Sequence, residues 1–266
     1  MAGTKASVRP DFATIGGLLL AAVGILGGLL LEGGQLKDVV QVTAALIVLG
    51  GTLGSVMVNT PLSTLLAAGG RMGSVLFETK HDANQRVEVL IDFATKARKA
   101  GIVALEREVQ ALDDPFLKKA LGLAMDGADL QDIRTMLELE MTSTENRGDQ
   151  EAKVFESAGG YAPTIGIIGA VLGLIQVMKN LSDVNEVGHG IAVSFVATVY
   201  GVALANIFLL PAANKIKART HEEVRLMELT MEGVTGIVEG MNPKLLRVKL
   251  EAFAPPSASA AKKAKA

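Results

Sequence analysis

Two long apolar segments of the chain carry hydroxyl groups but no charged side chain. Thr164 lies in the segment YAPTIGIIGAVLGLIQVM, and Thr198 lies in GIAVSFVATVYGVALANIF, which also holds Ser194 and Asn206. Hydroxyls can relay protons or bind cations, but ion pathways inside membranes are usually marked by an ionisable residue. Neither segment contains Asp, Glu, Lys or Arg. A conduit built from these side chains would therefore need its titrating acid from another chain.

Enzymatic chemistry has no visible basis in the sequence. The three histidines, His81, His189 and His221, are not spaced as metal ligands, and cysteine is absent. No glycine-rich phosphate loop is followed by Lys and Ser or Thr. We therefore expect no catalytic residue, no metal site and no cofactor, and the protein is not expected to be an enzyme. The net charge of -2 also argues against a nucleic-acid partner.

Four stretches without Asp, Glu, Lys or Arg are each long enough to cross a membrane, which takes about 20 apolar residues. They are Phe12–Leu31, Val39–Gly70, Ser157–Met178 and Val187–Asn214. The chain is 49% hydrophobic and has 29 glycines, a residue more frequent in transmembrane helices than in soluble ones. No alternation typical of strands stands out. The sequence therefore predicts an all-α, polytopic membrane protein with four transmembrane helices and a helical cytoplasmic domain.

Positive charges predict the orientation of these spans. Lys37 and Lys179 are the only Lys or Arg residues in the two short connections, and all others lie in the N-terminus, the central loop and the C-terminal tail. The positive-inside rule places both termini and the central loop in the cytoplasm. The expected domains are a first transmembrane hairpin at 1–70 (spans about 12–31 and 39–60), a cytoplasmic helical domain at 71–156, a second hairpin at 157–214 lining an ion path, and a cytoplasmic helix with a disordered tail at 215–266.

Helical patterns fill the central loop. The stretch ANQRVEVLIDFATKARKAG places four apolar side chains on one stripe: Val87, Leu90, Ile91 and Ala94. A second helix is predicted from Asp114 as N-cap with Pro115 at the first helical position, and a third from Asp129 as N-cap. The end of the tail, APPSASAAKKAKA, lacks apolar periodicity and is predicted to be disordered.

Geometry relates positions on the third and fourth spans. At about 1.5 Å per residue, Ala170 would lie roughly 13 Å and Thr198 roughly 16 Å from the outer ends of their spans, both near mid-membrane. Pro163 and Pro211 fall near the cytoplasmic ends. Because proline removes a backbone hydrogen bond and tends to kink a helix, these spans are expected to be jointed there. The alternative is that both prolines only start or end a helix.

Glycines four residues apart predict close helix packing. The pairs are Gly24/Gly28, Gly50/Gly54 and Gly169/Gly173. Packing alone would also suit a non-conducting membrane scaffold, so these pairs do not by themselves indicate an ion path.

The segments quoted above, YAPTIGIIGAVLGLIQVM and GIAVSFVATVYGVALANIFLLPAANKIKAR, resemble the paired third and fourth spans of the flagellar motor stator A-subunits, the MotA/PomA family of the MotA/TolQ/ExbB proton channel superfamily. ARKAGIVALERE at Ala97–Glu108 resembles that family's signature in the cytoplasmic loop. The resemblance covers nearly the whole chain, including the four-span layout with its large insert. It implies a stator subunit of the bacterial inner membrane that couples ion flow to torque in motility and chemotaxis.

The resemblance also implies partners. A B-subunit of MotB type would supply the membrane aspartate that carries the ion, which accounts for the missing acid. Five A-subunits would enclose two B-subunits, surrounded by membrane lipid, and the cytoplasmic domain would push the rotor protein FliG.

Several residues match the family's functional positions. Pro163 and Pro211 match its two functional prolines, and Thr198 matches its threonine facing the ion path. The family's rotor-contacting charges match Arg98 and Glu106, with Lys99 adjacent. Arg107 and Val109 depart from sodium-driven relatives, which are acidic at these positions. Without the resemblance, the charged stretch could be an ordinary solvated helix face.

The coupling ion follows from the same residues. In sodium-driven members a threonine stands at the position of Ala170, and often another at that of Ala197 beside Thr198. A hard cation wants several oxygen ligands, and with Thr164 as the other hydroxyl the chain offers few. The expected ion is H⁺, with Na⁺ as the alternative. A TolQ/ExbB-type energiser of envelope transport is the other alternative, although its members usually have three spans.

Overall fold

The computed structural model describes residues 7–80 and 83–253, and these divide into two compact units. The spanning unit comprises Arg9–Glu78 and Gly148–Ala218, and the charged unit comprises Met1–Val8, Thr79–Arg147 and Arg219–Ala266. These divisions lie several residues from the domain boundaries expected from the sequence. The reason is that helices α8 (Leu130–Lys179) and α10 (Leu210–Val238) belong to both units, so no loop marks the change. The predicted disordered end of the tail, 254–266, lies outside the described residues.

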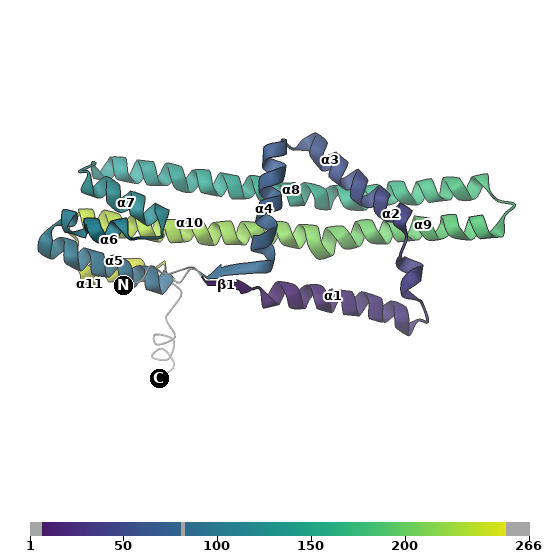
Figure 1. Cartoon of the computed structure of the whole chain (residues 1–266), viewed down its shortest axis with the longest axis horizontal. Coiled ribbons are helices and arrows are strands. Elements are labelled where there is room, and N and C mark those ends of the chain that lie inside the picture. The colour runs from purple at the N-terminus through teal and green to yellow at the C-terminus, as the bar shows by residue number, and fades with distance from the viewer. Residues whose placement is uncertain (1–6, 81–82, 254–266) are drawn as a thin grey trace. The chain divides into compact units, whose positions relative to one another are not determined.

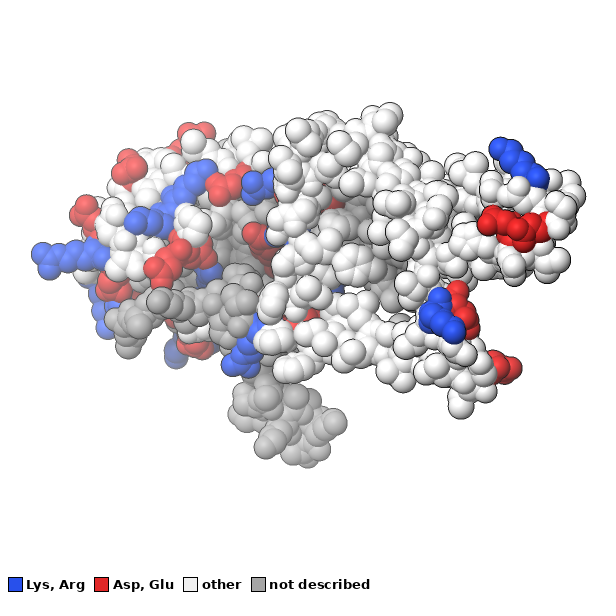
Figure 2. Space-filling model, turned by 45° about the vertical axis from the view of Figure 1, so that its right-hand side comes forward, with Lys and Arg blue, Asp and Glu red and all other residues white. Residues whose placement is uncertain are grey.

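Four helical runs are long and apolar enough to cross a membrane, which confirms the predicted class. They are Phe12–Leu31, Leu36–Asn59, Leu130–Lys179 and Val184–Val238. The first is α1; the last contains α9 (Val184–Ala203), the π-helical η4 (Leu204–Leu209) and α10. Figure 1 shows α8 and α9 as a long antiparallel hairpin joined by a short turn. On the face seen in Figure 2, the helices of the spanning unit are almost free of charged side chains except near their connecting ends.

The second span is assembled from several short pieces. It contains the 3₁₀ turn η1 (Leu36–Val39), α2 (Val42–Ala45), the π-helical η2 (Leu46–Gly50) and α3 (Gly51–Asn59). Thr60 is extended, and Pro61 then precedes a separate helix, α4 (Leu62–Leu76). Since the residue before a proline is disfavoured in helical conformation, the span ends at Asn59 although the charge-free window runs to Gly70.

Two short strands were not predicted. β1 (Ser7–Pro10) and β2 (Phe77–Lys80) form a two-stranded sheet. Each has four residues, SVRP and FETK, which is too short to show an apolar alternation in the sequence.

Small residues bring α8 and α9 into backbone contact. A Cβ atom added to Gly166 would lie 2.9 Å from the backbone oxygen of Ala197, and one added to Gly173 would lie 2.7 Å from that of Gly190. Gly169 and Gly173 therefore pack as predicted. The other predicted pairs do not: Gly24, Gly28, Gly50 and Gly54 have nothing within 4 Å of such an atom among the described residues. The four-residue spacing of glycines thus marks a small-residue face on a helix, but it does not identify which of these faces has a neighbouring helix.

The charged unit is a helical cluster around a leucine-rich core. Its elements are α5 (Ala83–Ala100), η3 (Ile102–Leu105), α6 (Glu106–Gln110), α7 (Pro115–Met125), the start of α8, the end of α10 and α11 (Pro243–Glu251). Its fully buried side chains include Leu90, Leu105, Leu117, Leu121, Ile133, Leu137, Leu229, Leu246 and Leu250. On the predicted α5 stripe, Ile91 is only half-buried, whereas its three companions are buried. The predicted Asp114 cap forms, because its carboxylate accepts from the Leu117 amide at 2.9 Å. The Asp129 carboxylate accepts instead from the adjacent Leu130 amide at 2.8 Å, and the Asp129 backbone oxygen accepts from the Ile133 amide at 2.9 Å.

Ion pairs connect the helices of this unit. Arg247 on α11 donates to both carboxylate oxygens of Glu88 on α5, at 2.5 and 2.8 Å. These hydrogen bonds hold the pKa of Glu88 below its ordinary value, because they favour the charged carboxylate. Glu232 on α10 pairs with Arg134 on α8 at 3.3 Å and with Lys249 on α11.

Candidate functional site

A chain of hydroxyl and carbonyl groups crosses the α8–α9 hairpin. The half-buried Thr198 donates its hydroxyl to the backbone oxygen of Ser194 at 3.2 Å. The buried Ser194 hydroxyl in turn lies 2.8 Å from the oxygen of Ala170 on α8 and 2.9 Å from that of Gly190 on its own helix. A hydroxyl has one proton, so Ser194 shares it between the two carbonyls. This contact fixes the hairpin at the depth of Thr198.

The structure places three of the four predicted ion-path residues in one layer. Ala197 is fully buried, and a Cβ atom on Gly169 would lie 2.8 Å from the Ala197 Cβ. Gly169 precedes Ala170, and Thr198 follows Ala197, so these positions lie within about one helical turn of one another along the hairpin. The glycine directly beside Thr198 is Gly166, where an added Cβ atom would lie 3.4 Å from the Thr198 Cα. Thr164 is not part of this layer. It is exposed, lies nearer the start of the predicted span, and donates its hydroxyl to the Tyr161 oxygen at 2.8 Å.

The two prolines lie within helices rather than at their ends. Pro163 is inside α8, and Pro211 is the second residue of α10 within the helical run Val184–Val238. The alternative that both only start or end a helix is therefore wrong. The π-helical η4 comes immediately before α10. Its wider turn gives the Pro211 ring room near the carbonyl four residues earlier, where an α-helix would be crowded.

The carbonyl group freed by Pro163 lies close to the residue that precedes Pro211. Gly159 is the residue whose carbonyl loses its helical partner because Pro163 has no N–H group. A Cβ atom on Gly159 would lie 2.6 Å from Cδ2 of Leu210, the neighbour of Pro211.

Ion pairs also connect the helices of the spanning unit. They join α4 to α8, α1 to α10, and α8 to α10: Arg71–Glu151 at 2.7 Å, Lys215–Asp11, and Lys217–Glu156 at 2.7 Å. Asp11 also caps α1 by accepting from the Thr14 amide at 3.0 Å. These ion pairs connect α8 and α10 to each other, α8 to α4, and α10 to the start of α1.

Tyr200 is a residue that the sequence did not single out. Its hydroxyl donates to the Val39 oxygen at 2.6 Å and accepts from the Gln41 amide at 3.2 Å. These are the backbone groups left open where η1 ends and α2 begins. Because unsatisfied backbone groups are costly in lipid, Tyr200 stabilises the interrupted start of the second span. A tyrosine in an otherwise apolar window was the available signal.

The predicted rotor-contacting residues lie at the end of α5 and the start of α6. Arg98, Lys99 and Glu106 are exposed, and in the described part of the chain no ion pair or side-chain hydrogen bond engages any of them. Their neighbour Lys96 differs, because it pairs with Asp92 at 2.7 Å and with Glu108 at 2.6 Å. Hydrogen bonds to Asp92 and then Glu108 raise the pKa of Lys96. The three predicted residues are thus available for contact with another molecule.

Family models account for most of the chain. Residues 15–101 match the model described as Motility protein A N-terminal, and residues 108–229 match that of the MotA/TolQ/ExbB proton channel family. Motility protein A of Bacillus subtilis is 34% identical over 92% of this chain and 91% of its own length. The structure of C. jejuni MotAB has a TM-score of 0.88 at 31% identity, covering 93% of this chain and 97% of that chain. The flagellar MotAB stator complex from Bacillus subtilis gives 0.86 at 33%, covering 92% and 96%. The chain therefore belongs to the MotA/TolQ/ExbB proton channel family, among its flagellar stator A-subunits.

Proposed function

We propose that this chain is the proton-conducting A-subunit of a flagellar stator and that it conducts only together with a B-subunit of MotB type. The observation that carries the proposal is the α8–α9 hairpin, whose charge-free windows Ser157–Met178 and Val187–Asn214 hold Ala170 and Thr198 but no Asp or Glu. A proton path needs a titratable group, and here a partner's membrane aspartate would supply it. Two similar solved structures are complexes named MotAB, which supports such a partner.

The layer around Thr198 favours H⁺ over Na⁺. Ala170 and Ala197 contribute only methyl side chains there, so the layer offers few side-chain oxygens to a cation. A dehydrated Na⁺ would need several oxygen ligands, whereas a proton needs only an acid and a hydroxyl or water to relay it. The half-buried hydroxyl of Thr198 therefore suits the relay of a proton better than the binding of a dehydrated Na⁺.

The assembly and its placement follow from the family. We infer five A-subunits around two B-subunits in the bacterial inner membrane, with both termini and the charged unit in the cytoplasm. Arg98, Lys99 and Glu106 would contact the rotor protein FliG, because they are exposed and unpaired within the described chain. Pro163 and Pro211 would form the joint through which ion passage acts on the charged unit.

An envelope-transport energiser of TolQ/ExbB type is the competing function. The match of residues 15–101 to the Motility protein A N-terminal model argues against it, because this region contains the extra first hairpin. Expression of the chain with its cognate B-subunit in a stator-deleted strain distinguishes the two. The proposal predicts restored swimming whose speed follows the proton gradient and not external Na⁺. Speed that rises with Na⁺ at fixed pH would exclude the proton-driven form.

A further inference from the structure

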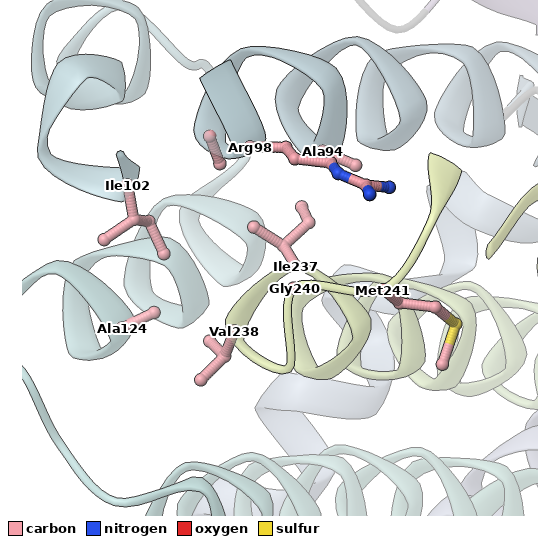
Figure 3. A pocket seen from close by; sticks show the side chains of 9 residues that line it. Ala94, Arg98, Ile102, Ala124, Ile237, Val238, Gly240 and Met241 are labelled. Atoms are coloured by element: carbon pink, nitrogen blue, oxygen red, sulfur yellow. The ribbon is translucent and has the colours of Figure 1, made fainter. Parts of the chain in front are cut away.

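A cavity of about 290 Å³ opens beside Arg98 in the charged unit. Apart from Arg98, the side chains that line it are apolar, and they include Ala94, Ala97, Ile102, Ala124, Ile237 and Met241. Figure 3 shows the Arg98 side chain extending along the cavity toward Met241, with Ile102 and Ala124 on the opposite side. The cavity therefore combines an apolar interior with one positive group.

The cavity results from small residues on two helices and in one turn. Ala97 on α5 and Ala124 on α7 present only methyl groups, and Gly240, with φ of +68°, turns the chain after α10. Pockets for drug-sized ligands run from about 300 to 1,000 Å³. At the lower end of that range, this cavity is large enough for one or two apolar side chains of another protein.

The positive charge beside the cavity indicates which kind of polar group would accompany an apolar side chain there. Arg98 and the adjacent Lys99 have no ion-pair partner among the described residues, whereas Lys96 one turn away has two. A free guanidinium at the rim of an apolar hollow favours a carboxylate next to an apolar group. The chain's own C-terminal segment 254–266 is a poor candidate, because its charged side chains are all lysines.

We propose that this cavity receives an apolar side chain of the rotor protein, next to a carboxylate that pairs with Arg98. The proposal rests on the proposed rotor contact and adds an apolar anchor to it. Exposed ion pairs are weak and screened by salt. Burial of an apolar side chain is not screened in this way, so the anchor would hold the contact while the charges set its orientation.

The test fills the cavity without changing any charge. Ala97→Leu places a larger apolar side chain in the hollow, and Ala100→Leu adds the same bulk to an exposed position of α5 that does not line it. Both are introduced into the full A–B complex, and binding of the purified rotor protein is measured. Loss of one central anchor predicts a Kd weakened on the order of tenfold for Ala97→Leu. Ala100→Leu should bind as the unmodified complex does.

Arg98→Glu separates failure of this inference from failure of the proposed function. If Arg98→Glu weakens binding but Ala97→Leu does not, the rotor contact stands and the apolar anchor is wrong. If neither variant changes binding, the rotor contact itself is wrong.

A cross-link covers the case in which Ala97→Leu disturbs the fold. The chain has no cysteine, so Val238→Cys at the wall reports on this position alone. The proposal predicts a disulfide with a cysteine placed beside an apolar residue on the rotor protein. Cross-linking only between copies of this chain, or none with any rotor position, would overturn it.

Discussion

The Ser194 hydroxyl on α9 lies 2.8 Å from the backbone oxygen of Ala170 on α8, and this hydrogen bond crosses the α8–α9 hairpin one turn from Thr198. Gly173 and Gly190 bring the two backbones together at the same end of the hairpin. Close backbone contacts continue along the hairpin as far as Gly201, where an added Cβ atom would meet the backbone oxygen of Ala162, the residue before Pro163.

Gly173→Ala should destabilise the hairpin. Its new Cβ atom would lie 2.7 Å from the Gly190 oxygen and against the Ser194 hydroxyl, so the helices must separate. Overpacking of this kind costs about 1–3 kcal/mol. We expect a lower Tm of the purified A–B complex than for Gly188→Ala, whose added methyl group meets nothing within 4 Å. Equal Tm values for the two variants would show that the close contact is not needed.

Pro163→Ala should abolish torque while leaving assembly intact. Alanine restores an amide that can bond to the Gly159 oxygen, so the joint is lost but the packing of α8 is kept. The matched control is Pro243→Ala at the first position of α11, where the missing amide has no helical partner. Swimming and co-purification with the B-subunit are measured together. If Pro163→Ala swam normally, or failed to co-purify, the joint would not be the role of this proline.

Local patterns made the spans and the helix caps predictable. Charge-free runs of about 20 residues identify membrane helices, and Asp114 before Pro115 identifies a helix start, because both depend on neighbouring residues only. The break before α2 depends instead on Tyr200, which lies 161 residues from Val39 in the chain. No local pattern could reveal that contact.

The site was predictable in type more than in geometry. The spacing of Ala170 and Thr198 from the ends of their spans gave their common depth, but the Ser194 bridge that fixes them involves residues 24 positions apart. The cavity beside Arg98 could not be predicted from the sequence either, because α5, α7 and the end of α10 meet only in the folded chain. Charge alone could not separate Lys96, which is paired, from Arg98, which is not.

Reversal of the exposed charges should remove motility without loss of stability. Arg98→Glu and Glu106→Lys break no ion pair of the described chain, so the Tm of the complex should not change while swimming is reduced. Lys96→Glu is the informative contrast, since it breaks the pairs with Asp92 and Glu108. Exposed pairs contribute roughly 0–1 kcal/mol, so its Tm should fall slightly. Normal swimming of the Arg98/Glu106 double variant would indicate a merely solvated face.

The Glu88–Arg247 pair should make stability depend on acid pH. The pKa of Glu88 is lower in the folded state than its ordinary value of 4.5. The stabilisation is therefore fully present above that value and is lost as pH falls through the lowered folded pKa. Both side chains are substantially exposed, so the effect is at most about 1 kcal/mol. In thermal unfolding of the complex, Glu88→Gln should be less stable at neutral pH, and the difference should vanish in acid; a constant difference would contradict this.

Ala170→Thr should shift the ion preference toward Na⁺. The new hydroxyl would stand in the same layer as Thr198 and add an oxygen ligand where there is now a methyl group. Swimming speed against external Na⁺ at fixed pH should be flat for the unmodified protein and should begin to rise for the variant. Ala170→Val, which adds similar bulk without oxygen, is the control and should stay flat. A rise in both variants would point to shape and not to ligand chemistry.

Ion flux into sealed vesicles tests the central claim most directly. The purified chain alone should carry no H⁺ current, because its ion-path hairpin holds no Asp, Glu, Lys or Arg between Ser157 and Met178 or between Val187 and Asn214. The chain reconstituted with its B-subunit should carry H⁺ independently of Na⁺, and replacement of the partner's membrane aspartate by asparagine should stop the flux. Robust H⁺ flux through the chain alone, or flux that survives the asparagine replacement, would contradict a path completed by the partner's acid.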